Sequence, residues 1–253
     1  MYAEYETPKI GISFFYYDDN YEPETAEAVV QCLESNRLFP PNKFLSGHLT
    51  NNRYRKYKPE MRDLFIKSYS EKDIFTTTWK NVSAKNKAEY FDAHWTLTYH
   101  KSSDKVGART FKAWNVITLF ATYDWISVES NYWHLIKCMH ELVPILHPFN
   151  ITIDDIANAN SLEGIVDDGL LKGTAPPEPC PRHLRTSPIY WGNYWGPDIC
   201  KLYDVSKLAE LPVKNLKEIN GGVFFTLTDN VMEFDTPECK MVRSIINTEI
   251  LHK

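Results

Sequence analysis

The stretch from Trp114 to His147 constrains the fold more than any other part of the chain, because it joins two different hydrophobic patterns. Residues 116–121 are apolar except at Thr118 and rich in β-branched and aromatic side chains, which predicts a buried strand. From Ser127 to Leu146 the pattern becomes that of a helix with one apolar stripe, formed by Val128, Tyr132, Leu135, Ile136, Met139, Leu142 and Val143. We therefore expect a core strand and then a core helix, with Ser127 as its cap and Pro144 at its end.

The order of strand, turn and helix occurs three times, near residues 10–36, 114–146 and 222–250. The first helix begins at Pro23, and the last follows an Asn220-Gly221 hairpin turn and is capped by Thr236. Alternating strands lie between these units, which favours antiparallel pairing. We predict one α+β domain over residues 1–253, with a largely antiparallel sheet and helices packed on one face. In the last helix, Met241, Val242, Ile245 and Ile246 are expected to face inward.

The charge balance favours a protein partner over a nucleic acid. The formal net charge is −5, whereas nucleic-acid binders usually carry a basic surface. The basic cluster Arg53, Arg55, Lys56 and Lys58 fits a solvated edge better than an anion site. The first residues lack a secretion signal, and no apolar run reaches the length of a membrane span. We therefore expect a cytoplasmic protein that does not bind a membrane, and its five cysteines, which form no CxxC pair, to be free thiols.

No motif for nucleotide, metal or nucleophilic chemistry stands out, so we expect no catalytic residue, metal or cofactor. The alternative is a metal-dependent hydrolase that uses the pairs Asp18-Asp19, Asp154-Asp155 and Asp167-Asp168. Each pair lies in a predicted turn, where Asp is common because its carboxylate bonds nearby backbone amides. His134 and Cys138 lie one helical turn apart, but two ligands do not make a zinc site.

Two neighbouring segments supply candidate partner-binding residues. Residues 154–187 form a long excursion rich in proline, whose acidic half contributes Glu163, Asp167 and Asp168. The aromatic run Ile189–Gly196 that follows contributes Tyr190, Trp191, Tyr194 and Trp195, as core residues or as interface anchors. For these four rings the core interpretation is favoured.

The aromatic run, together with residues 11–19 and Gly221–Asp229 before the last helix, resembles bacterial polymorphic-toxin immunity proteins of family 52 and related type VI secretion immunity proteins. The resemblance implies a cytoplasmic antidote in bacterial competition that binds and neutralises a cognate toxin without chemistry of its own. Toxins paired with such families are often nucleases with basic clefts, which an acidic, aromatic-rich inhibitor suits. An assembly subunit, recognisable by a self-complementary apolar patch, is a further alternative.

Overall fold

The computed structural model describes residues 9–16, 22–38, 41–46, 55–70, 75–82, 90–97, 115–159 and 189–251. The chain forms two compact units, with boundaries between Ile12 and Ser13 and between Pro148 and Phe149. The central unit contains residues 13–148, and the C-terminal unit contains residues 149–253 together with residues 1–12. A single domain over residues 1–253 stays a prediction, and each unit is described by itself.

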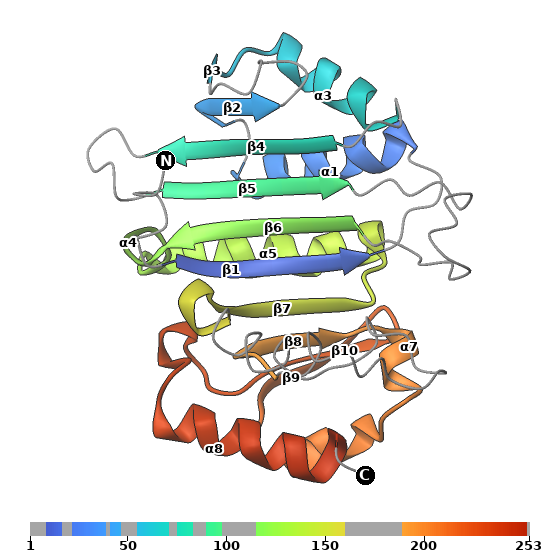
Figure 1. Cartoon of the computed structure of the whole chain (residues 1–253), viewed down its shortest axis with the longest axis vertical. Coiled ribbons are helices and arrows are strands. Elements are labelled where there is room, and N and C mark those ends of the chain that lie inside the picture. Colours follow the sequence, from blue (N-terminus) through green and yellow to red (C-terminus); the bar gives the residue numbers. More distant parts are fainter. Residues whose placement is uncertain are drawn as a thin grey trace, which may run out of the picture. The chain divides into compact units, whose positions relative to one another are not determined.

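The sheet of the central unit has the strand order β3-β2-β4-β5-β6, and β1 lies next to β6 (Figure 1). These strands are β1 (Lys9–Tyr16), β2 (Lys43–Ser46), β3 (Arg55–Lys56), β4 (Phe75–Val82), β5 (Tyr90–Leu97) and β6 (Asn115–Thr122). The pairs β2–β3, β2–β4, β4–β5 and β5–β6 are antiparallel, with Trp95 opposite Ile117 in the last of them. Ser13 of β1 and Thr118 of β6 form a hydrogen bond through their hydroxyl groups, with the two oxygen atoms 3.1 Å apart.

Helices α1 and α5 lie along one face of this sheet (Figure 1). The helices of the central unit are α1 (Pro23–Ser35), α3 (Glu60–Ser70), α4 (Tyr123–Ile126) and α5 (Glu129–Leu146). Helix α1 packs against both α3 and α5. As predicted, it begins at Pro23, and its stripe of Ala26, Val29, Val30 and Leu33 is buried.

Helix α5 differs from its prediction at both ends. Val128 is the N-cap residue and is 44% exposed, whereas Ser127 donates its hydroxyl to the carbonyl of Asp124 at 2.9 Å. The expected cap and the first stripe residue are therefore wrong, because the short helix α4 occupies the preceding turn. The helix also continues through Pro144 and ends at His147, whose φ of 46° is left-handed. The central part of the stripe, from Leu135 to Val143, is buried as predicted.

The C-terminal unit has the strand order β7-β8-β10-β9, all paired antiparallel. Its strands are β7 (Asn150–Asp155), β8 (Gly192–Trp195), β9 (Lys214–Ile219) and β10 (Gly222–Thr226). Its helices are α7 (Pro197–Cys200) and α8 (Pro237–Ile246), with 3₁₀ turns η3 (Val205–Glu210) and η4 (Val231–Glu233) and the π turn η5 (Asn247–Leu251).

The hairpin and the last helix of this unit begin as the sequence predicts. Asn220 and Gly221 both have positive φ, at 50° and 74°, which fits a two-residue turn between β9 and β10. Thr236 accepts a hydrogen bond from the amide of Cys239 and caps α8. The prediction that Met241 faces inward is wrong, since its side chain is 52% exposed. The buried stripe is rotated toward Cys239, Val242, Arg243 and Ile246 because Arg243 is held inside the unit.

The fold class is confirmed as α+β. The strand pairs with assigned registers are antiparallel, and the predicted units of strand and helix correspond to β1–α1, β6–α5 and β10–α8.

Candidate functional site: partner-binding surfaces

The four predicted aromatic anchors lie in the core of the C-terminal unit. Trp191 is 0% exposed, Tyr194 and Trp195 are each 1% exposed, and Tyr190 is 7% exposed. Because an anchor must be accessible before binding, the structure supports the core interpretation of this run. A partner could reach the four rings only after the unit rearranged.

Each large ring of the run is fixed by a specific contact. The indole nitrogen of Trp191 donates to the hydroxyl of Thr228 at 2.7 Å, which satisfies its one buried donor. Trp195 packs edge-on against Phe225, with ring centroids 5.0 Å apart. The hydroxyl of Tyr194 donates to the carbonyl of Ile219 at 3.2 Å, and burial raises the pKa of Tyr194 to about 12. These rings therefore connect β8 to β9, β10 and the residues after β10.

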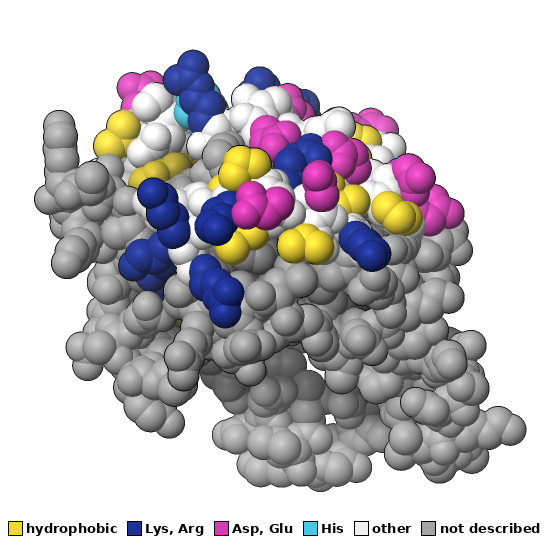
Figure 2. All heavy atoms as spheres, turned by 90° about the horizontal axis from the view of Figure 1, so that it is seen from above, with side chains coloured by type: hydrophobic (Ala, Val, Ile, Leu, Met, Phe, Trp, Pro, Cys, Tyr) yellow, Lys and Arg dark blue, Asp and Glu magenta, His cyan; other side chains and the backbone are white. Residues whose placement is uncertain are grey.

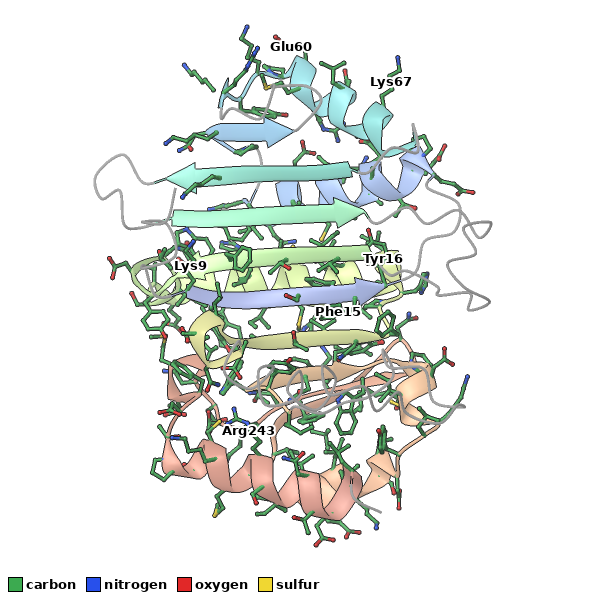
Figure 3. The ribbon with its side chains drawn as sticks, viewed as in Figure 1. Lys9, Phe15, Tyr16, Glu60, Lys67 and Arg243 are labelled. Carbon is green, nitrogen blue, oxygen red and sulfur yellow. The ribbon has the colours of Figure 1, made fainter. Side chains whose placement is uncertain are left out.

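Asp154, at the end of β7, is the centre of a buried polar network. Its carboxylate accepts hydrogen bonds from the backbone amide of Trp191 at 2.9 Å and from the side-chain amide of Asn158 at 2.8 Å. Arg243 of α8 lies 3.6 Å from the same carboxylate and donates its Nε to the carbonyl of Ile189 at 2.7 Å. Figure 3 shows the Arg243 side chain pointing from α8 toward the strands. Burial raises the pKa of Asp154, and the hydrogen bonds from Asn158 and Trp191 oppose that rise.

This network brackets the segment that carries the predicted acidic residues. Glu163, Asp167 and Asp168 lie outside the described residues, within 160–188. Asp154 and Asn158 precede the segment, and Ile189 and Trp191 follow it. Asp154 and Arg243 therefore hold together the two ends from which the segment departs.

Asp154 and Asp155 are the last two residues of β7, so the prediction that this pair lies in a turn is wrong, although Asp154 does bond nearby backbone amides. Both oxygens of Asp154 already accept hydrogen bonds, one of them from the backbone amide of Asp155 at 2.8 Å. The other two aspartate pairs lie outside the described residues. Within the described ranges, no group of three or more His, Cys, Asp or Glu side chains could hold a metal ion.

The described cysteines are free thiols, as predicted, and Cys180 lies outside the described residues. Cys138 of α5 faces Cys32 of α1, with the two sulfur atoms 3.7 Å apart. The hydrogen bond between the thiols and their burial raise the pKa of Cys138, so this thiol stays protonated. Asn36 donates its side-chain amide to Glu141 at 2.6 Å beside this pair, so the contact joins α1 to α5.

An acidic helix layer in the central unit was not predicted from the sequence. Helices α3, α1 and α5 pack in that order and carry seven Asp or Glu and three Lys or Arg side chains, a formal charge of −4. None of these ten side chains is buried. Figure 2 shows acidic and basic side chains side by side on one face, with several Lys and Arg side chains near one another at its lower left. The basic residues Arg55, Lys56 and Lys58 are exposed at and just after edge strand β3, as the sequence predicts for a solvated edge, and Arg53 of the same cluster lies outside the described residues.

Arg62 fastens α3 to α1 within this layer. Its guanidinium lies 2.6 Å from the carboxylate of Glu27 and 3.0 Å from that of Glu34. The hydrogen bond from Arg62 lowers the pKa of Glu27, and the two carboxylates raise the pKa of Arg62. The pairing holds three charges on adjacent helices in a fixed arrangement.

The exposed side of α5 carries a ridge of four residues spaced by four: Glu129, Trp133, Lys137 and Glu141. Trp133 is 58% exposed, and its indole nitrogen donates to Glu129 at 3.4 Å. Lys137 pairs with Glu141 at 3.6 Å. The signal was present in the sequence, because these positions lie off the apolar stripe.

The sequence matches no protein-family model and no curated protein. Among solved structures, the chain is similar to the Pseudomonas aeruginosa T6SS protein PA0821, with a TM-score of 0.55 and 13% sequence identity. The match covers 87% of this chain and 65% of that chain, so this chain spans slightly less than two thirds of that protein. At this identity the likeness shows a shared fold. Membership of immunity family 52 stays a prediction.

In the part of the chain that the structure describes, no helix is long and apolar enough to cross a membrane.

Proposed function

We propose that this chain is an immunity protein of a type VI secretion or related polymorphic toxin system. In this proposal it binds a cognate antibacterial toxin and neutralises it by covering the toxin's functional surface, without catalysing a reaction. The fold shared with a T6SS protein and the resemblance of the N-terminal, aromatic and C-terminal motifs support the type of system.

The observation that carries the binding role is the acidic layer of α3, α1 and α5. Its three helices carry seven acidic and three basic side chains, a formal charge of −4, so acidic groups outnumber basic ones on this set of helices. A concentrated charge attracts an oppositely charged protein and speeds its encounter, with rates that fall as salt rises. A nuclease toxin with a basic substrate cleft is a partner of this kind.

The residues that flank 160–188 are held in place by the Asp154 network, which supports a second point of contact with the partner. Asp154 and Arg243 fix the segment's two ends, and Glu163, Asp167 and Asp168 lie on it. Positions next to a rigid sheet commonly carry binding residues, because the sheet fixes where the chain leaves it. We propose that these three carboxylates add to the attraction for a basic partner.

The test is co-expression with the product of the adjacent upstream gene. We expect the two proteins to co-purify, the gene product alone to kill cells, and this chain to restore viability. Replacing Glu163 by Gln and Asp167 and Asp168 by Asn, all together, should weaken binding. It should also make binding less sensitive to salt concentration, because fewer charges attract the partner. The matched control is Asp198→Asn, an exposed carboxylate on α7. Absence of both binding and protection would refute the proposal.

A further inference from the structure

Within the acidic layer of α3, α1 and α5, the exposed ridge of α5 supplies a specific contact surface. We propose that Glu129, Trp133, Lys137 and Glu141 form a docking surface for a basic protein partner, with Trp133 receiving a Lys or Arg side chain of that partner. This inference rests on the proposed function, because it identifies where the cognate toxin binds.

Trp133 differs from the other exposed hydrophobic residues. Among the side chains that the structure describes, seven large hydrophobic ones are exposed, and of these Trp133 is the most exposed and the only aromatic one. Tryptophan is enriched among the few interface residues that dominate binding energy, because a single ring buries a large area. Val128, 44% exposed at the start of the same helix, adds apolar surface nearby.

The ring is held in place before any partner arrives. Its nitrogen donates to Glu129 at 3.4 Å, and Tyr132 lies edge-on to it with ring centroids 5.3 Å apart. A side chain that is already ordered loses less conformational entropy on binding. The exposed indole is therefore a preorganised contact and not only a solvated side chain.

The charges around the ring select a cation. A Trp face attracts Lys or Arg, and the carboxylate that holds the indole nitrogen adds a negative charge beside it. Glu141 continues the ridge; it pairs with Lys137, and through Asn36 it connects to α1. Lys137 is thus the one basic group of the ridge, and it is balanced by Glu141.

The same charge argues against other occupants of this face. A second copy of the chain would bring two layers of formal charge −4 together, and an anionic lipid surface would be repelled. A basic protein surface gains attraction from the whole layer and a specific contact at Trp133. The charge of the layer therefore favours a basic protein as the partner that binds this surface.

The experiment is a titration, by calorimetry, of the purified upstream gene product into the full chain and its variants. Trp133→Ala should weaken binding by about 30-fold or more, as expected for a central aromatic contact. Glu129→Lys should also weaken binding and reduce its salt dependence. The control is Met241→Ala, which removes a similarly exposed hydrophobic side chain from α8 and should leave affinity unchanged. Because Trp133 is exposed, the urea midpoint of Trp133→Ala should match that of the wild type.

The outcomes separate the two proposals. If the wild type binds and Trp133→Ala binds as well as Met241→Ala does, the docking surface is refuted and the immunity role stands. If the wild type does not bind the gene product, both are refuted. Selective loss of affinity in Trp133→Ala and Glu129→Lys, with unchanged stability, supports the docking surface.

Discussion

Replacing Asp154 by alanine tests whether the buried network stabilises the C-terminal unit. The carboxylate is 1% exposed and accepts hydrogen bonds from the amides of Asp155 and Trp191 and from the side chain of Asn158. It is also the charged partner of Arg243, whose side chain is 11% exposed. Alanine removes the acceptor and leaves both the Trp191 amide and the guanidinium inside the unit.

The magnitude follows from what remains unpaired. A buried donor left without an acceptor costs about 1–3 kcal/mol, and removing one partner of a buried ion pair costs about 3–5 kcal/mol in total. Arg243 keeps its hydrogen bond to the carbonyl of Ile189, so the same range of about 3–5 kcal/mol applies and not a larger one. With a urea m-value of about 2.5 kcal/mol/M, the midpoint should fall by about 1–2 M.

The assay is urea unfolding followed by tryptophan fluorescence, to which the buried Trp191 and Trp195 of the C-terminal unit contribute. Asp198→Ala is the matched control, because Asp198 pairs with Lys201 at the shorter distance of 2.8 Å but its side chain is 67% exposed. The control should change stability by less than about 0.5 kcal/mol. Asp154→Asn should fall between wild type and Asp154→Ala, since it keeps one acceptor. Equal midpoints for Asp154→Ala and Asp198→Ala would refute the claim that burial makes this pair important.

Two further predictions concern backbone packing and pH. Gly222→Ala should destabilise the C-terminal unit by about 1–3 kcal/mol in urea unfolding, because its Cβ would meet the carbonyl of Trp195 and the hydroxyl of Tyr194 at 2.5 Å; an unchanged midpoint would contradict this. The pKa of Glu27 is lowered chiefly by Arg62, so its ionised form stabilises the folded state above its ordinary pKa and this contribution is lost as pH falls through the lowered value. The stability difference between wild type and Glu27→Gln should therefore shrink from about pH 6 to about pH 3, as measured by urea titrations at several pH values, and a constant difference would count against the Arg62 contact.

Local sequence signals predicted the elements well where they depend on neighbours in the chain. The Asn220-Gly221 turn, the Thr236 cap and the apolar stripe of α1 are confirmed, because turn dihedrals, caps and helical periodicity depend on a few adjacent residues. The errors, at Val128, Pro144 and Met241, lie where a neighbouring element decides the outcome. A helix face is buried only relative to what packs on it, and the sequence does not specify that partner.

The candidate surfaces show the same division. The sequence by itself determined the composition, the net charge of −5 and the strand and helix periods, since these are properties of the chain or of short segments. Only the tertiary structure decided that Trp191 and Trp195 are buried while Trp133 is exposed, and that Asp154 meets Arg243 across about ninety residues. It also gathered the charges of α3, α1 and α5 into one acidic layer. Burial and electrostatic fields arise from groups that folding brings together, so they follow from packing and not from order along the chain.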